Sequence, residues 1–224
     1  MATNPKRPGM PWRVALCVAL LLVSGAARAD VAESASSGFA ALLAELKRGH
    51  AIDYQKLRYL YAKTAAFDPY GGYAEKGRMM SAYKDKDCSK AAPAATAVLA
   101  ANYTDIDAHI VMAECAKAHS DAATYGRHRA IAIGLLDSIA RSGNGLKPES
   151  AYVVISVAEE YAFLGTRGYR VKKQSLVRVE PHEYDAMDVV DKAGTSTRVY
   201  FNVDIPTNWL KPKLSKSPLA SPPK

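Results

Sequence analysis

The sequence is poor in cysteine, phenylalanine and tryptophan, and it lacks long apolar runs. Its 224 residues include 3 Cys, 4 Phe and 2 Trp, against 13 Tyr. A helix that spans a membrane needs about twenty consecutive apolar residues, and no segment after the N-terminal 29 residues comes near that length. The balanced composition, with 49% hydrophobic and 23% charged residues, is that of an ordinary globular domain and excludes collagen and coiled coil.

Acidic residues are absent from both ends of the chain. Residues 1–29 and 205–224 each contain four Lys or Arg and no Asp or Glu, although the whole chain has 30 Lys and Arg against 22 Asp and Glu. Residues 30–204 are therefore electrically balanced. Proteins that bind nucleic acid gain their affinity mainly from cations placed against phosphates, so we expect no nucleic acid partner.

The common enzyme motifs are also missing. The sequence contains no G-x-S-x-G, Walker loop, G-x-G-x-x-G, H-E-x-x-H or EF-hand pattern. We therefore expect no cofactor and no metal, and we favour a protein that is not an enzyme. An enzyme with a less familiar site stays open, because the absence of a motif does not exclude catalysis.

The N-terminus has the order of a secretory signal peptide. Three cations precede an apolar run over residues 14–23, and small residues follow. The run is about ten residues long, too short to cross a bilayer. The sequence predicts a signal peptide over 1–29, cleaved between Ala29 and Asp30, and a periplasmic or secreted protein with no transmembrane segment after cleavage.

Two cysteines remain after the predicted cleavage, Cys88 and Cys115. An exported protein with two cysteines is expected to form one disulfide. The spacing agrees with this, because residues 89–101 and 104–118 are predicted as an antiparallel helical hairpin, and the midpoint of the two cysteines falls in its turn. A pair of catalytic or metal-binding thiols is the alternative, but no C-x-x-C or His/Cys cluster supports it.

The first half of this body has apolar residues at helical spacing. A first helix is predicted at 34–48, and Asp53 is the expected N-cap of a second one. Further helices are predicted at 75–83, 89–101, 104–118 and 122–141. Ser89 and Asp121 are the expected caps of two of them, which would place Pro93 in a first helical turn. The last three helices are similar in layout to a tetratricopeptide hairpin.

The apolar period changes to near 2 after Pro148, which indicates a sheet. The continuous apolar run over 152–158 predicts a central strand, and further strands are predicted at 169–179, 185–191 and 197–204. We therefore expect one α+β domain over residues 30–205, in which helices (34–141) pack on a small, mostly antiparallel sheet (150–204). Residues 206–224, rich in Pro and Lys, are predicted to be a disordered tail.

Several segments together resemble a bacterial family known as domain of unknown function 4919. They are Leu57-Arg58-Tyr59-Leu60-Tyr61, Pro69-Tyr70-Gly71, Asp105-Ile106-Asp107-Ala108-His109, the stretch from Ile139 on, Gln174-Ser175-Leu176, Tyr184-Asp185 and Tyr200-Phe201-Asn202-Val203. The resemblance covers most of residues 39–204. This chain has Asn144 where the family usually has Asp. The resemblance implies a secreted bacterial protein of no assigned activity and no assigned catalytic residues.

Two groups of side chains have the composition of a metal or acid–base site. Asp105 and His109 are four residues apart on a predicted helix, and His128 lies one helix later. Residues 182–185 offer His, Glu and Asp in a predicted turn. We favour structural roles for both groups, because an acid near a helix start is stabilised by the dipole and His128 falls on an apolar face.

Arg58 and the pair Glu159-Glu160 are a further candidate. Neighbouring side chains on a strand face opposite ways, so one of the two carboxylates must be partly covered, and Arg58 is its expected partner. Tyrosine combines apolar area with a polar tip, which suits a binding surface. The candidate binding residues are Arg58, Tyr61, Tyr70, Glu160 and Tyr161.

The sequence thus favours an exported, non-catalytic binding or adaptor module of the bacterial cell envelope, whose partner is an envelope protein or a small ligand. The alternative is a hydrolase with an Asp/Glu/His site at the junction of helices and sheet. In that case His109, Glu160 or Asp185 would be the important residues.

Overall fold

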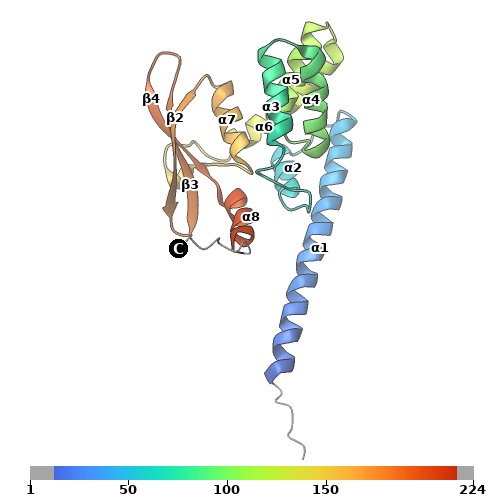
Figure 1. Cartoon of the computed structure of the whole chain (residues 1–224), viewed down its shortest axis with the longest axis vertical. Coiled ribbons are helices and arrows are strands. Elements are labelled where there is room, and N and C mark those ends of the chain that lie inside the picture. Colours follow the sequence, from blue (N-terminus) through green and yellow to red (C-terminus); the bar gives the residue numbers. More distant parts are fainter. Residues whose placement is uncertain (1–12, 216–224) are drawn as a thin grey trace, which may run out of the picture.

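The computed structural model describes residues 13–215, and the side chains of residues 30–215. It is an α+β fold with the helices first and the sheet last, as the sequence predicts. Helix α1 (Arg13–Lys47) is long and passes through the predicted cleavage point without a break (Figure 1). Residues 1–12 of the predicted signal peptide lie outside the described residues, and the cleavage stays a prediction. No helix between residues 13 and 215 combines the length and apolar character that a bilayer crossing requires.

The middle of the chain forms a stack of antiparallel helices, and four of its five helices have an aspartate as N-cap. The helices are α2 (Tyr54–Tyr61), α3 (Tyr73–Lys84), α4 (Cys88–Ala101), α5 (Ile106–Ala118) and α6 (Ala122–Ala140). The carboxylates of Asp53, Asp87, Asp105 and Asp121 each accept a backbone N–H of the first turn. The expected caps Asp53 and Asp121 are confirmed. Ser89 is wrong as a cap, because Asp87 takes that role two residues earlier and leaves Pro93 inside the helix.

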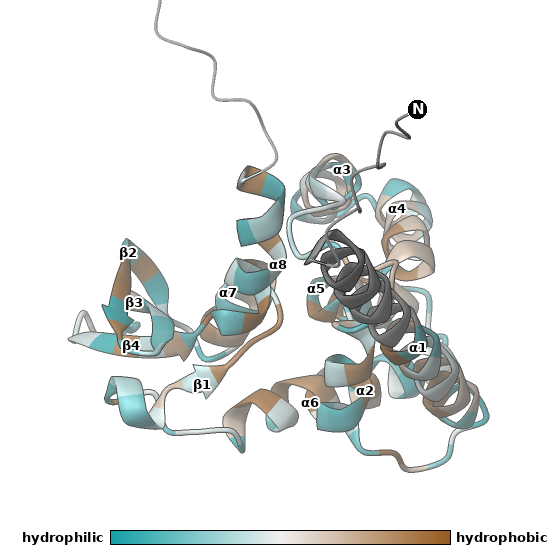
Figure 2. Cartoon of the chain, turned by 90° about the horizontal axis from the view of Figure 1, so that it is seen from below, coloured by the Kyte–Doolittle hydropathy of each residue, from teal (hydrophilic) through white to brown (hydrophobic). Residues whose placement is uncertain are grey.

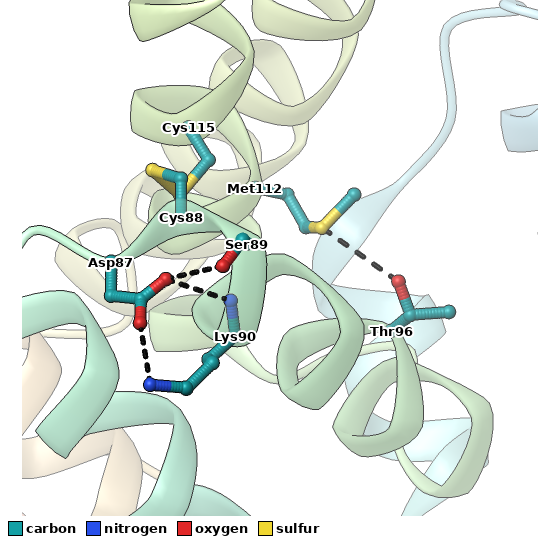
Figure 3. The surroundings of a disulfide bond; sticks show 7 residues. All are labelled: Asp87, Cys88, Ser89, Lys90, Thr96, Met112 and Cys115. Carbon is teal, nitrogen blue, oxygen red and sulfur yellow. Dashed lines mark hydrogen bonds and ion pairs between the residues drawn. A yellow bond between two sulfur atoms is a disulfide. The ribbon is translucent and has the colours of Figure 1, made fainter.

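The predicted disulfide is present. Cys88, at the start of α4, is bonded to Cys115, near the end of α5, with a Cα–Cα distance of 5.4 Å (Figure 3). The bond ties the open end of this hairpin, since the α4–α5 turn lies at the other end. Asp87 next to it accepts hydrogen bonds from Ser89 Oγ and Lys90 N, which fixes the start of α4 beside the bridge.

The sheet has the strand order β1-β4-β3-β2. Its strands are β1 (Tyr152–Val153), β2 (Arg170–Val179), β3 (His182–Val190) and β4 (Ser196–Asn202). β1 pairs in parallel with β4, and the other pairs are antiparallel.

The predicted central strand over 152–158 is wrong. Only Tyr152 and Val153 pair, at the edge of the sheet, and helix α7 (Val157–Thr166) follows. Ser156 caps that helix by accepting the backbone N–H of Glu159, and Ser-x-x-Glu is the sequence of a capping box. The apolar run was compatible with a strand or a helix, and the capping box at Ser156 favours the helix.

The predicted disordered tail is also wrong over its first part, where the structure has helix α8 (Asp204–Leu214). Trp209 Nε1 donates to the carbonyl oxygen of Phe67 at 2.8 Å, and Lys211 Nζ lies 3.0 Å from Glu183 Oε2. These contacts hold α8 against the loop after α2 and against β3. Residues 216–224 of the predicted tail lie outside the described residues.

Helix α7 lies between the sheet and the helical stack. Figure 2 shows α7 and α8 between the strands on one side and α2–α6 on the other. Phe163 and Leu164 of α7 share one core with Leu135 of α6 and with Met187 and Phe201 of the sheet. A second core fills the α3–α5 stack around the disulfide. The position of α7 therefore determines how the two layers meet.

The disulfide yields the first prediction. It joins residues 27 apart in sequence, so replacing Cys88 and Cys115 together with Ser is expected to lower the free energy of unfolding by roughly 3 to 4 kcal/mol. Urea unfolding of the double variant and of the oxidised protein measures this. Addition of a reductant should lower the urea midpoint of the oxidised protein toward that of the double variant and leave the midpoint of the variant unchanged. Identical midpoints for all samples would contradict the prediction.

Candidate functional site

Arg58 is buried and binds three other elements. Its Nε and Nη2 atoms donate to the two carboxylate oxygens of Glu159 at 2.7 and 2.5 Å. Nη1 donates to Ser138 Oγ of α6 at 3.1 Å, and Nη2 also donates to the carbonyl oxygen of Val153 at 3.0 Å. The expected pair of Arg58 with one of the two glutamates is confirmed, and the partner is Glu159. Because its donors are used inside the protein, Arg58 is a structural residue more than a ligand-binding one.

Beside this ion pair two adjoining cavities, of about 50 and 260 Å³, form what we call the groove. Its walls are the loop 66–72, the first turn of α3, the α4–α5 turn and the start of α7. The residues that line both cavities are Tyr61, Asp68, Gly71, Lys76, Asn102 and Asp105. The groove thus contains the predicted candidate Tyr61 and lies directly against Glu159.

The groove is acidic. Five carboxylic side chains and a single cationic one line it: Asp68, Glu75, Asp105, Asp107 and Glu159, with Lys76. Lys76 Nζ lies 2.8 Å from Asp105 Oδ2 and 3.1 Å from Asp107 Oδ2. Burial opposes the charge of Lys76, but the two aspartates outweigh it and raise its pKa. Glu159 is likewise paired with Arg58 and Glu75 with Arg78. With Asp68, Asp105 and Asp107 against Lys76, the groove keeps a net negative charge.

Tyr61 and the turn beside it shape the floor of the groove. Burial, with the charges of Asp68 and Asp105, raises the pKa of Tyr61 to about 12, so it stays a neutral phenol. A Cβ at Gly71 would come within 2.9 Å of the Asp68 carboxylate, and Gly72 has a positive φ of 74°. The positive φ favours glycine at position 72, and a side chain at position 71 would require Asp68 to move.

A second acidic feature lies on the opposite face of α7. Glu160 is fully buried and neither of its carboxylate oxygens has a hydrogen-bond partner; burial, with the nearby Asp185 of β3, raises its pKa well above the usual range. Asp185 Oδ2 accepts from Gln174 Nε2 at 2.5 Å, and Gln174 Oε1 accepts from the Tyr161 hydroxyl at 2.9 Å. Burial without a donor or a cation favours the neutral, protonated form of the Glu160 carboxyl group.

Tyr70 lies between these two regions. Its loop borders the groove, and its ring packs on Trp209 of α8 with centroids 5.9 Å apart. Burial raises the pKa of Tyr70, and the nearby Tyr73 and Asp185 add to the rise. The structure thus brings the predicted candidates Tyr70, Glu160 and Tyr161 near Asp185. Trp209 was missed, because the tail around it is polar and rich in proline.

Asp105, His109 and His128 do not come together as the metal site or acid–base pair that their spacing suggested. His109 Nε2 donates to the carbonyl oxygen of Tyr103 at 2.9 Å, and its Nδ1 lies 2.8 Å from His128 Nδ1. Asp105 caps α5 and faces Lys76 instead. The ring nitrogens of His109 are thus used by His128 and Tyr103. The hydrolase alternative expected a site made of Asp, Glu and His, and His109 does not join Glu160 and Asp185 in such a site.

The predicted turn over 182–185 is in fact the start of strand β3. Successive side chains there point to opposite faces of the sheet. His182 Nδ1 lies 2.6 Å from Asp204 Oδ2 of α8, and Glu183 binds Arg178 and Lys211. Asp185 is linked to α7 through Gln174, which accepts from the Tyr161 hydroxyl. Among the side chains of residues 30–215, no three His, Cys, Asp or Glu are grouped as a metal site requires.

These features define an α+β protein whose helical and sheet layers are joined by one helix, with an acidic groove on one side of that helix. The chain belongs to the family described as Domain of unknown function (DUF4919), which its residues 32–211 match. The resemblance noted from the sequence is thereby confirmed. No curated protein and no solved structure matched the chain.

Arg58 gives a prediction about stability. Arg58→Ala leaves the Glu159 carboxylate buried without its partner, so we expect the free energy of unfolding to fall by about 3 to 5 kcal/mol. Arg78→Ala is the matched control, since Arg78 forms a surface ion pair with Glu75 and its loss should cost about 1 kcal/mol or less. Urea unfolding at neutral pH compares the two, and equal losses would contradict the structural role.

His109 gives a prediction about pH. Burial lowers its pKa from 6.5 to about 4. Between these two pH values His109 is protonated in the unfolded chain and neutral in the folded protein. The stabilisation is complete above pH 6.5 and is lost as the pH falls toward 4, by about 3 kcal/mol in all. Urea unfolding across this range should show that the free energy of unfolding depends less on pH in His109→Gln than in the control His119→Gln, whose side chain is exposed. Equal slopes would exclude His109 as the cause.

Proposed function

We propose that the protein is an exported, non-catalytic binding module of the bacterial cell envelope. In this proposal the groove holds a cationic group, such as a lysine or arginine side chain of an envelope protein or a small amine. The observation that carries the proposal is the lining of the groove, in which Asp68, Asp105 and Asp107 outnumber the single Lys76, while Glu159 and Glu75 are paired with arginines.

The shape of the groove supports the same class of ligand. Small residues form the outer wall: Ala66, Gly71, Gly72, Ala97 and Ala101. They leave a cavity of about 260 Å³, and a water molecule occupies about 30 Å³ in the liquid. One long side chain or a small amine would fill this space. The apolar stem would lie against the small residues while its charged end reaches Asp68 or Asp105.

The proposed localisation agrees with the cysteine chemistry. The Cys88–Cys115 disulfide is of the kind that persists in oxidising compartments and is rare in the cytosol. The order of cations, apolar run and small residues before Asp30 supports export by a signal peptide. We therefore place the protein in the periplasm or outside the cell.

The hydrolase alternative has one observation in its favour, the meeting of Glu160 and Asp185 at the junction of helix and sheet. A protonated and an ionised carboxyl group together are what acid–base hydrolysis uses. However, Glu160 is fully buried, Asp185 is 6% exposed, and neither lines the groove. A substrate would not reach them in this conformation, and this is why we favour binding.

Site-specific photocrosslinking tests the binding proposal. A photoreactive residue is placed at Ala97, which lines the groove, or at Ala100, an exposed position on the same helix that does not line it. The full chain is expressed in its native host and irradiated in intact cells. We expect a defined product from Ala97 alone, which Asp68→Asn weakens about tenfold because a charge-assisted hydrogen bond is lost.

Two outcomes would overturn the proposal. Equal products from Ala97 and Ala100 would show that the groove is not the contact. A product from Ala97 that is insensitive to Asp68→Asn and to a competing amine such as cadaverine would show that positive charge is not what the groove recognises.

A further inference from the structure

Strand β2 is an edge strand whose outer side has no partner within residues 13–215. It is the last strand of the order β1-β4-β3-β2, and no other described segment forms a backbone hydrogen bond along that side. Figure 2 shows β2 at the margin of the sheet, at the opposite end from β1. An edge strand presents a row of unpaired N–H and C=O groups, which is a template for one more strand.

The regular part of this edge runs from Lys173 to Val179. These residues pair with β3 in unbroken register, whereas a bulge interrupts the pairing between Val171 and Lys173. A segment of about seven residues, an ordinary strand length, would fit beside them. The strand at the other margin, β1, contains only Tyr152 and Val153 and offers no comparable length.

The first half of β2 is basic and lacks acidic partners. The strand contains no Asp or Glu and four cationic side chains: Arg170, Lys172, Lys173 and Arg178. Arg178 is paired with Glu183 of β3. The other three are exposed, and none of them forms an ion pair within residues 30–215. Asp188, which lies opposite Lys173 in the ladder, is bound by Arg198 of β4. A ligand with acidic groups would complement these free cations.

The second half of the edge is apolar. The side chains of Leu176 and Val179 are 62% and 40% exposed, and Val177 lies between them. Because side chains alternate along a strand, Val177 and Val179 lie on one face of the sheet and Leu176 lies on the other. A strand beside β2 would therefore meet apolar side chains on both faces at this end, and cations at the end where β2 begins.

We propose that the outer edge of β2 binds an extended acidic segment of another protein as an additional strand. The backbone of the segment pairs with Lys173–Val179. Its acidic residues lie beside Lys172 and Lys173, and its apolar residues lie beside Leu176 and Val179. This site is separate from the groove and goes beyond the proposed function, because its ligand is an acidic chain and not a cationic group.

A second copy of this chain fits the edge less well. Since β2 contains no acidic residue, two paired β2 strands would leave Arg170, Lys172 and Lys173 of both copies without a partner and would bring more cations together. Lysine on an edge strand also keeps the sheets of identical proteins apart. The same cations thus disfavour a second β2 and favour an acidic partner.

A synthetic peptide tests the site on the oxidised full chain. The peptide is Val-Thr-Val-Thr-Val-Glu-Glu with blocked ends, an order that places its acids at the start of β2 in an antiparallel ladder, which is the more stable kind. Its affinity is measured by fluorescence anisotropy, and hydrogen exchange is followed in fragments that cover 170–179. At saturation we expect exchange over 173–179 to slow at least about tenfold, because the outward N–H groups gain acceptors.

Two methylated peptides separate strand addition from adsorption by charge. One has N-methyl groups on its odd residues and the other on its even residues. In an antiparallel ladder only alternate residues direct their N–H groups to the neighbouring strand, so one peptide should lose binding and the other keep it. Equal affinities of the two methylated peptides would overturn the proposal, as would unchanged exchange over 173–179 with the unmodified peptide.

A pair of double variants tests the charge of the partner. Lys172→Gln with Lys173→Gln should weaken peptide binding at least about fivefold, since each exposed charge pair contributes modestly. Lys56→Gln with Lys63→Gln, two exposed lysines in and just after α2, is the matched control and should bind as the wild type does.

Equal affinities of the two double variants would exclude an acidic partner. Analytical ultracentrifugation adds a further contrary outcome. If the wild type does not bind the peptide and Lys172→Gln with Lys173→Gln self-associates, the cations serve only to keep β2 edges apart, and the proposal is wrong.

Discussion

The structure depends on the buried ion pair between Arg58 and Glu159. One guanidinium group joins α2 to α6, to the edge strand β1 and to α7, so four elements far apart in sequence share a single fixed point. A buried charge is tolerated only when its partners satisfy it, and here every contact is a hydrogen bond at 2.5 to 3.1 Å. This constraint sets the position of α7, and through α7 it sets the distance between helices and sheet.

Two neighbouring glutamates on α7 have opposite chemistry because they face opposite layers. Glu159 points to the helical stack and meets Arg58, whereas Glu160 points to the sheet and meets another acid, Asp185. The first is satisfied by a cation, whereas the second has no hydrogen-bond partner and a raised pKa. This difference places the acidic groove on one side of one short helix and a buried acid without a cation on the other.

Much of the local structure could be predicted from the sequence. Asp53 and Asp121 were recognisable as helix caps, and the symmetry of Cys88 and Cys115 about a turn indicated their bond. The partnership of Arg58 with one of two glutamates followed from the cost of burying a carboxylate alone. The apolar run over 152–158 misled, since its periodicity suits both a strand and a helix and the capping box Ser156 to Glu159 was overlooked.

The sequence by itself determined the starts of α2 and α6, the disulfide, the order of the helical stack before the main strands and the family, because these depend on neighbours along the chain or on recurring motifs. Only the tertiary structure decided which carboxylate meets a cation and which is buried without one, and that Trp209 covers the loop at Phe67. The groove likewise combines α3, the α4–α5 turn and α7. The charge state of a buried group depends on what surrounds it in space, and residues separated by 101 positions, such as Arg58 and Glu159, meet only after folding.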